Sequence, residues 1–577
     1  MLTNGVPLNS FALNVAGATP GGELVPVPAP RSVLWSCRLM LGDEDVTAQV
    51  TGGIRIEREE GAAAIAEFSL YLPEVGVDVV GWTGRPVEIF YRETLGAGWI
   101  EEMRFSGWLE QPSYDPRNRI VSCEATDRLQ DLVEAMEIAD IEALVGGVWT
   151  VDVFEATDGR SRWDYASERL ASVAGSLDRS VAGALRVTPW VAQAPSKRFA
   201  AGTTIDGSLS VDIAKLSDRV NRVELSLSYR FSRLRERHQA FNWEHPDIQG
   251  WSVDNGFCIW RANSTELPTI DMVEEALSSA GYNLLAGAQF LTVPLSGVYC
   301  DPPQAWRNDF DNLLLAADVV GGMRWTQAVT ETYTLTVEAP ASVAQAGAVL
   351  RRDGGSVESE LARAEDWESA AFTAPEPDAV QDAIEDYLVD LRETPRLELA
   401  ASCLLMGARV SILSAHRANK VAWQVPTSMA LGIDLVDTVL MEDRIRAQGK
   451  VFSLIDEYDL QGQTAISTIT LAISRGGGTD DDPLTLPPPP NSDITGEAPE
   501  LIQLPTQLRG RGLMTYDDEL DGFAGNYDEL DIGSPPDAFP RRHQVTAPEV
   551  PAEHRDEFTA ETARTYRVLV PNDLLEL

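Results

Sequence analysis

The chain has 577 residues, which at roughly 150 residues per domain suggests about four domains. Its 46 Lys and Arg are outnumbered by 89 Asp and Glu, and the formal net charge of −43 excludes a broad surface for gripping nucleic acid. Lysine is rare, and the sequence contains neither a polybasic segment nor a run of 18 apolar residues, so we expect no stable membrane insertion. The N-terminus lacks a signal-peptide pattern, which favours folding in the cytoplasm.

The sequence offers no motif for catalysis or for a cofactor. The five cysteines are far apart and include no C-x-x-C pair, so we expect buried thiols rather than disulfides, a zinc site or an iron–sulfur cluster. The histidines are scattered, and the separation of His238 and His245 is not a recurring metal-ligand spacing. Carboxylate pairs such as Glu57 with Glu59 are expected by chance in so acidic a chain. We therefore predict no catalytic residue, no metal and no cofactor.

The first 140 residues divide into an arm and a small barrel. Residues 1–31 are interrupted by Asn-Gly and Pro-Gly-Gly turns, and they form either a loose terminus or an added strand on a neighbouring sheet. Within residues 32–140, short runs alternate apolar and polar residues with period two, as antiparallel strands do. Apolar members of these runs are Ala66, Phe68, Leu70, Leu72, Val87, Ile89 and Tyr91. We predict a first tube-like antiparallel β-barrel here.

Residues 141–340 form a mixed α+β region with long strands. The alternation over 223–231 is the clearest strand pattern in the chain, and a second long alternation covers 329–337. Between them, apolar residues at helical spacing predict a helix over 270–280, which Gly281 ends.

The next part of the chain is predicted as a helical insertion followed by a second barrel. Within residues 341–395, Asp378 followed by Gln381 three positions later predicts a helix start, and Pro395 is expected to end that helix. Strand patterns return over residues 396–475, which we predict to form a second tube-like barrel.

The last part, residues 476–577, is a Pro-rich linker and an acidic tail, with seven Arg against 21 Asp and Glu. Such a composition does not build its own core, so the tail is either disordered or extended across other subunits. A tandem element repeats a tyrosine followed by carboxylates, and it lacks the residue order of a calcium loop. Its candidate partner-docking residues are Tyr516, Asp517, Tyr527 and Asp528. We expect the tyrosines to be apolar anchors on a basic groove of a partner.

Together these patterns predict a mainly β chain with α+β insertions, two small antiparallel barrels, intervening mixed domains and an extended tail. Three passages, taken in order, then become informative. They lie at 45–132, 218–224 and 433–455. The positions that matter in them are Phe105, Gly107, Asp127 and Leu132, then Asn221, then Asp437, Val439, Gly449 and Val451. This order resembles the baseplate hub (tail tip hub) proteins of bacteriophage tails, which are related to the base of secretion-system spikes.

The resemblance implies a structural protein of the virion, assembled in the host cytoplasm. It implies a homotrimer in which each chain contributes two barrels, so that three chains present six similar units to a sixfold ring, the tail tube or distal tail protein above. Tip, central fibre or receptor-binding proteins would attach below. It also implies a central channel through which DNA passes without specific binding, and an acidic lining would repel phosphate there.

Two other classes of function remain open from the sequence. One is a tail-borne or secreted enzyme that degrades polysaccharide or peptidoglycan, because its β-modules would have a similar sequence texture. The other is a carbohydrate-binding adhesin, in which exposed tryptophans such as Trp243, Trp251 and Trp260 would form the platform. The alternative role for these tryptophans is packing in a core or a subunit interface.

Overall fold

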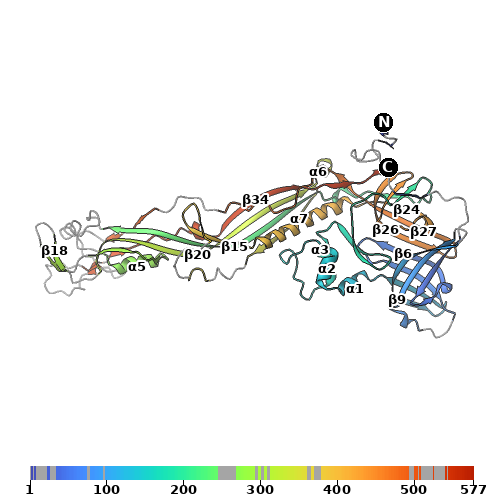
Figure 1. Ribbon diagram of the computed structural model, residues 1–577, viewed down its shortest axis with the longest axis horizontal. Helices are drawn as coiled ribbons and strands as arrows, with labels where there is room; N and C mark the ends of the chain where they lie inside the picture. The colour runs from blue at the N-terminus through green and yellow to red at the C-terminus, as the bar shows by residue number, and fades with distance from the viewer. Residues whose placement is uncertain are drawn as a thin grey trace.

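In the computed structural model the chain is elongated, with a β-sheet body at one end and a long arm leading away from it (Figure 1). The structure describes residues 34–73, 78–94, 98–244, 268–292, 312–359, 366–369, 378–492, 500–504 and 543–577, together with 22–25 and the short strand segments 2–3, 6–7, 296–299, 304–307, 506–508, 524–525 and 540–541. The predicted docking residues of the tail lie outside this set: Tyr516, Asp517, Tyr527 and Asp528.

The first half of the body is an antiparallel sheet that curls around one apolar core. Its strands are β4 (Leu34–Leu41), β5 (Glu44–Asp45), β6 (Val50–Glu59), β7 (Ile65–Tyr71), β8 (Pro86–Thr94), β9 (Trp99–Asp115) and β10 (Ile120–Thr126). They lie side by side in the order β6-β7-β10-β9-β8-β4-β5. Because alternate side chains of a strand point to one face, residues such as Ile56, Phe68 and Ile89 are buried together in this core.

A small helical cluster packs against this half through a separate core. It consists of α1 (Leu129–Glu134), α2 (Ile138–Val145), α3 (Arg162–Leu170) and the hairpin of β11 (Gly175–Arg179) and β12 (Leu185–Pro189). Leu129, Ile141 and Tyr165 are buried at its centre.

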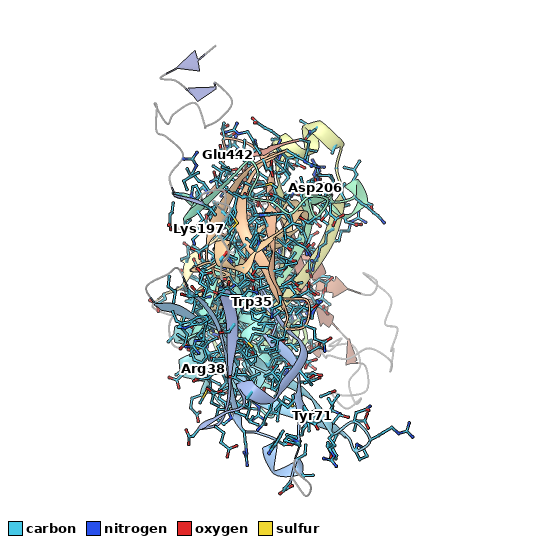
Figure 2. The ribbon with its side chains drawn as sticks, turned by 90° about the vertical axis from the view of Figure 1, so that its right-hand side faces the viewer. Trp35, Arg38, Tyr71, Lys197, Asp206 and Glu442 are labelled. Carbon is cyan, nitrogen blue, oxygen red and sulfur yellow. The ribbon has the colours of Figure 1, made fainter. Side chains whose placement is uncertain are left out.

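The second half of the body repeats the curled sheet. Its strands are β3 (Glu23–Val25), β13 (Lys197–Ala200), β14 (Ser210–Asp212), β24 (Asn419–Pro426), β25 (Thr438–Glu442), β26 (Arg446–Asp459), β27 (Thr464–Ile473) and β36 (Leu575–Glu576). Viewed end-on, this half lies above the first, with Glu442 towards its upper end and Tyr71 at the lower end of the first half (Figure 2). Strand β3 pairs with β13, so part of the predicted N-terminal arm adds a strand to the chain's own sheet.

The two halves are joined into one sheet rather than two closed barrels. Strand β26 pairs with β27, and its Ser453–Asp459 portion also pairs with β6 of the first half. Among the described strands, β4 and β6 are not paired to each other, so the first half does not close on itself. The predicted mainly β fold is confirmed, whereas the two predicted barrels are not closed among the described strands, because β6, an edge strand of the first half, pairs with β26 of the second half and not with β4.

The arm is built on a single long hairpin. Strand β15 (Arg222–Glu244) pairs antiparallel with β20 (Leu314–Glu338) along its whole length, which at about 3.3 Å per residue extends roughly 75 Å. This confirms the strands predicted at 223–231 and 329–337 and extends them outward. The predicted helix over 270–280 is also confirmed, as α5 (Ile270–Ser279) near the far end of the arm. Smaller strands there are β16 (Asn283–Leu284), β17 (Gln289–Thr292), β18 (Ser296–Tyr299) and β19 (Gln304–Arg307).

The predicted helical insertion is wrong in its main element. The segment around Asp378 forms β22 (Val380–Gln381) and β23 (Tyr387–Leu391), and the helix begins only afterwards as α7 (Thr394–His416). Asp382 explains the difference, because its Oδ1 accepts hydrogen bonds from the backbone N–H groups of Ile384 and Asp386 and so closes a tight turn. Pro395 lies in the first turn of α7, where a missing N–H costs nothing, instead of ending a helix. The remaining elements are α6 (Pro340–Ala346) and β21 (Leu350–Glu358).

Helix α7 lies along the base of the arm, where strands were predicted. By length and composition it is apolar enough to cross a membrane, but half of its most apolar window is buried inside the protein. Leu397, Leu404 and Ile412 pack with the apolar row of β15 and β20 in one core. Helix α7 is therefore a core helix of this fold.

The described parts of the tail lie on the chain itself. Strand β29 (Ile502–Gln503) pairs with β15, and β34 (Phe558–Arg567) pairs parallel to β20 on the way back towards the body. Other pairings are β28 (Arg475–Gly477) with β35 (Val570–Asn572), β30 (Thr506–Leu508) with β33 (His543–Val545), and β31 (Ala524–Gly525) with β32 (Pro540–Arg541); α8 (Ala552–Arg555) precedes β34 and β1 (Leu2–Thr3) pairs with β2 (Val6–Pro7). Tyr566 and Val570 are buried in the core with α7. The expectation that the tail crosses only other subunits is corrected for these segments.

Candidate functional site

The two halves of the body contain the same strand unit. In the first unit the order is β6-β7-β10-β9-β8, and in the second it is β14-β24-β27-β26-β25, with every neighbouring pair antiparallel. Within each unit the four consecutive strands of the chain occupy the same relative places. The flank differs, because β4 pairs antiparallel with β8 whereas β13 pairs parallel with β25.

The two units also match in register, residue by residue. In the first, Leu109 lies opposite Ala125 and Glu110 has no partner before pairing resumes at Gln111. In the second, Val451 lies opposite Leu471 and pairing resumes at Ser453. One extra residue therefore bulges at the same point of each unit: Glu110 in β9 of the first unit and Phe452 in β26 of the second. A shared bulge at a shared register is a designed feature of a fold rather than an irregularity.

A glycine stands next to each bulge. Gly107 lies opposite Val87, and Gly449 lies opposite Val439. A Cβ at Gly107 would lie 2.5 Å from the carbonyl oxygen of Thr126, and a Cβ at Gly449 would lie 2.4 Å from that of Ala472. Only glycine permits strands to approach this closely.

A backbone hydrogen bond also recurs two residues beyond each glycine. Leu109 N–H donates to the carbonyl of Arg85 at 2.9 Å, and Val451 N–H donates to the carbonyl of Asp437 at 2.9 Å. Arg85 immediately precedes β8, and Asp437 immediately precedes β25, the equivalent strand of the second unit. The passages that carried the sequence resemblance thus occupy equivalent places in two copies of one unit.

The structure brings most of the resemblance residues to these two places. Phe105 and Gly107 lie in β9, Val439 in β25, and Gly449 and Val451 in β26. Asp437 stands in the turn before β25, where its Oδ2 accepts from the N–H of Asp434. The other three lie apart from the bulges: Asp127 accepts from the N–H of Leu129 at the start of α1, Leu132 is half-buried in α1, and Asn221 is buried at the base of the arm.

The junction between the units is held by a buried ion pair. The Arg104 guanidinium of β9 donates two hydrogen bonds to the Asp456 carboxylate of β26, at 2.9 and 3.1 Å, and both side chains are only 1% exposed. Burial raises the pKa of Asp456, but Arg104 and Arg58 outweigh it and hold that pKa below its usual value. The carboxylate is therefore charged, and its ion pair holds β26 of the second unit against β9 of the first.

Two further ionic contacts extend this junction, one centred on Asp434 and one on Glu60. Arg58 of β6 bonds Asp434 at 3.1 Å, and Arg186 bonds the other oxygen of Asp434 at 2.7 Å. The second contact is between Lys450 of β26 and Glu60, next to β6, and both of these side chains are buried. Sequence reasoning did not find these groups, because the partners of each cross-unit pair are hundreds of residues apart in the chain.

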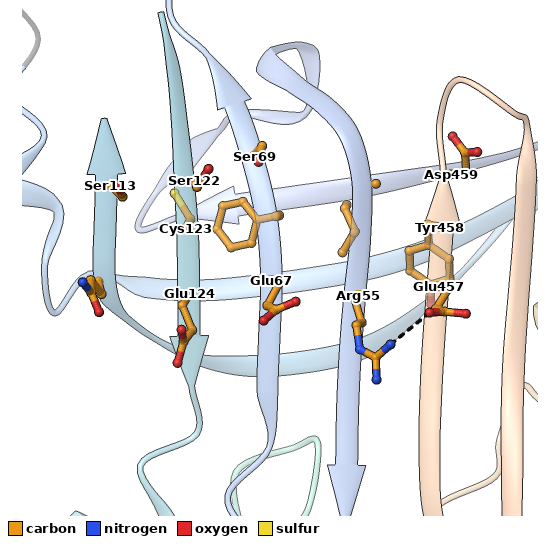
Figure 3. Close-up of a pocket in the computed structure, with 14 residues that line it drawn as sticks. Arg55, Glu67, Ser69, Ser113, Ser122, Cys123, Glu124, Glu457, Tyr458 and Asp459 are labelled. Atoms are coloured by element: carbon orange, nitrogen blue, oxygen red, sulfur yellow. Dashed lines mark hydrogen bonds and ion pairs between the residues drawn. The ribbon is translucent and has the colours of Figure 1, made fainter. Parts of the chain in front are cut away.

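The polar face of the joined sheet is hollowed into a groove of about 650 Å³ (Figure 3). It spans β6, β7, β9, β10 and β26, so it crosses the junction of the two units. Its floor carries Glu67, Glu124, Glu457 and Asp459, and Arg55 is bound to Glu457 at 3.1 Å. The groove is therefore acidic overall, and its acidic groups come from three strands, β10, β7 and β26.

The alternative sites from the sequence find little support in the described residues. No group of three or more His, Cys, Asp or Glu in that part of the chain is placed to hold a metal ion. His238 Nε2 lies 2.6 Å from Glu236, while His245 lies outside the described residues. Trp243 is 3% exposed and packs in the core of the arm, so it forms no sugar platform. Trp251 and Trp260 lie outside the described residues.

The expected buried thiols are confirmed where the structure describes them. Cys37, Cys123 and Cys403 are buried and unpaired, and burial raises the pKa of Cys123 to about 12. These thiols are core residues with no nucleophilic character at neutral pH.

Sequence comparisons give no family, since no protein-family model matches the chain and no curated protein matches it. Structural similarity is found to tail proteins. The tail protein from Neisseria meningitidis MC58 aligns over 76% of this chain and 96% of its own, with 10% identity and a TM-score of 0.37. The 43 kDa tail protein of prophage MuSo2 from Shewanella oneidensis covers 76% and 98%, with 10% identity and a TM-score of 0.33. The Francisella PdpA-VgrG complex (lidded) covers 77% and 53%, with 6% identity and a TM-score of 0.29.

Proposed function

We propose that this chain is the structural hub of a bacteriophage tail tip, a homotrimeric ring that adapts a sixfold tail tube to a threefold tip. The observation that carries the proposal is the duplicated strand unit, which matches in strand order, in bulge position and in glycine register. Two equivalent units in one chain allow three chains to present six similar surfaces, as closed cyclic symmetry requires.

The acidic groove supports a passive role towards DNA. In a ring of such units the polar face of the joined sheet would line the channel. Its carboxylates, including Glu67, Glu124 and Glu457, would repel the phosphate backbone, so the duplex would pass without binding. Apart from this repulsion the protein would act by shape and symmetry, with no chemical turnover.

The proposal also assigns partners to each part of the chain. The six units would face the tail tube or the distal tail protein, while the arm and the acidic tail would hold tip, central fibre or receptor-binding proteins. In the tail, Tyr516 and Tyr527 are the proposed apolar anchors, with Asp517 and Asp528 beside them. Replacing both tyrosines with Ala is expected to release a tip protein and to leave the ring intact.

Native mass spectrometry of the full chain, combined with hydrolysis assays, tests the proposal. We expect three copies and no release of sugar or peptide from capsule, lipopolysaccharide or peptidoglycan. A stable monomer, or turnover abolished by replacing one pair of carboxylates, would refute the hub and favour the enzyme.

A further inference from the structure

Within one chain the two units are joined by the pairing of β26 with β6, whereas the equivalent strands β9 and β14 are not paired with each other among the described strands. Strand β26 pairs with β27 on one edge and, beyond its bulge, with β6 on the other. The equivalent part of β9, residues 111–115, pairs with β10 alone among the described strands. The strand equivalent to β6 is β14, and in the described chain it pairs with β24 alone. Each unit thus leaves one edge open, and the two open edges are equivalent to the two that are joined.

We infer that these edges pair between copies, so that residues 111–115 of one chain add to β14 of the next in the register that β26 uses on β6. The matched registers fix the partners. Asp456 lies opposite Ile56 within the chain, and the equivalent residues are Tyr114 and Val211. Two residues along each strand, Leu454 lies opposite Arg58, and their equivalents are Pro112 and Ile213.

The exposure of the side chains supports this assignment. At the joint within the chain, Asp456 is 1% exposed and Arg58 is 4% exposed. The equivalent side chains on the open edges are apolar and uncovered, because Tyr114 is 44% and Ile213 is 53% exposed. Burying Tyr114 and Ile213 against a second copy of the chain would remove their apolar surface from water, just as the joint of β26 with β6 buries the equivalent side chains.

The backbone and the charges agree with the same register. Next to β6, Glu60 N–H donates to the carbonyl of the bulged Phe452 at 3.0 Å. The equivalent residues are Lys215 and the bulged Glu110, which carry opposite charges. Pro112 stands in the place of Leu454 and has no N–H, so it leaves one donor out of the ladder and contributes its ring to the contact.

Unlike a twofold contact, this interface is head to tail, since residue 114 meets residue 211 and never another residue 114. That property gives a sharp test. The double variant combines Tyr114→Cys with Val211→Cys in the full chain, in which Cys258 and Cys300 are first replaced by Ser. It is then oxidised at low protein concentration. Directly opposed strand residues lie within the Cα separation that a disulfide spans. We expect the double variant to crosslink into dimers and trimers, and either single variant to remain uncrosslinked.

A second pair of variants keeps the test independent of disulfide geometry. Tyr114→Asp and Ile213→Asp are each expected to reduce self-association at least tenfold. The matched controls Val151→Asp and Leu399→Asp, which alter exposed apolar side chains at and beside α7 and away from both edges, are expected to leave it unchanged. Circular dichroism checks that all four variants fold.

The inference rests on the proposed function only for the number of copies, and the outcomes separate the two. A wild-type trimer that neither crosslinks in the double variant nor dissociates in the Asp variants overturns the edge pairing and leaves the hub standing. Crosslinks between 114 and 211 in an assembly of another size uphold the edge pairing and refute the threefold hub. A monomeric wild-type chain refutes both.

Discussion

Gly107 and Gly449 hold the same place in two copies of one strand unit. Gly107 lies opposite Val87, the second residue of β8, and Gly449 lies opposite Val439, the second residue of β25. At either position an added Cβ would lie within 2.5 Å of a carbonyl oxygen. Residues this far apart in sequence share a register because the chain contains its own structural repeat. The repeat is the property from which the assembly proposed above follows.

The two glycines give the first prediction. Gly107→Ala and Gly449→Ala each place a methyl group against backbone, and we expect each to lower the free energy of unfolding by about 1–3 kcal/mol. Gly407→Ala is the control, since it lies in α7 and an added Cβ would meet nothing within 4 Å there, and we expect it to be neutral or to stabilise by about 1 kcal/mol. Denaturant titration compares the three, and equal effects at all three sites would contradict the packing argument.

The arm contains a buried ionic ladder between two apolar cores, and this gives the second prediction. Arg235 and Arg237 of β15 both donate to Asp386, at 2.7 to 2.9 Å, and all three side chains are buried. Asp386→Asn would remove the counter-charge of Arg237 and one of the two that Arg235 has, since Arg235 keeps Asp382, and we expect a cost of about 3–5 kcal/mol. Hydrogen exchange along β15 and β20 should rise accordingly.

A surface pair supplies the control for the ladder. Asp353 bonds Arg351 while both are about half exposed, so Asp353→Asn is expected to cost less than about 1 kcal/mol. If Asp386→Asn were as mild as this, the buried ladder would not be a structural support of the arm.

The return of the tail to the body gives a prediction in pH. Burial raises the pKa of Asp573 to about 6, although its Oδ2 accepts from the N–H of Ser474. Because the folded pKa lies above the unfolded one, this group favours the folded tail fully below about pH 4, and the advantage is lost as the pH rises through 6. Asp573→Asn removes that loss, so at pH 8 it should be more stable than the wild type by up to about 3 kcal/mol.

The same variant carries its own control. At pH 2.5, where Asp573 is protonated in both states, wild type and Asp573→Asn should unfold at nearly the same denaturant concentration. A difference that persists unchanged at low pH would mean that the substitution acts by packing rather than by ionisation.

The groove gives a prediction about DNA. Glu67→Lys combined with Glu124→Lys reverses two charges on its floor, and the assembled variant should retain duplex DNA at low salt and release it as salt rises. Asp43→Lys with Glu44→Lys makes the same net change at an exposed turn, and it should retain less. Filter binding against salt concentration measures both. Equal retention would show that the groove is not where DNA passes.

Local pattern in the sequence predicted the elements whose partners lie nearby. The alternation that begins at Val223 marks β15, yet the strand continues through Arg233 to Arg237, where buried charges replace the apolar row and hide the period. Helix α7 was missed because its many buried positions weaken the helical period. Asp378 and Gln381 have the spacing of a helix cap, but the turn closed by Asp382 follows them and the chain forms strands there. The errors at β15 and α7 came from residues whose partners are brought in by tertiary structure, whereas the error near Asp378 came from a local turn.

The candidate site divides in the same way. Gly107 and Gly449 stand out in the sequence as parts of short motifs, but their equivalence depends on strand pairing. The joint of β26 with β6 connects residues some 400 positions apart, and no local pattern encodes such a register. The ion pair of Arg104 with Asp456 is likewise visible only once the two strands are adjacent.

Electron microscopy of the purified full chain, viewed down the axis of the particle, tests the central claim most directly. The account predicts a closed ring of six similar lobes in which alternate lobes are identical, so that the true symmetry is threefold, with three arms leaving the ring on one side. A single elongated particle, or a ring whose lobe number is not twice the number of chains, would contradict it.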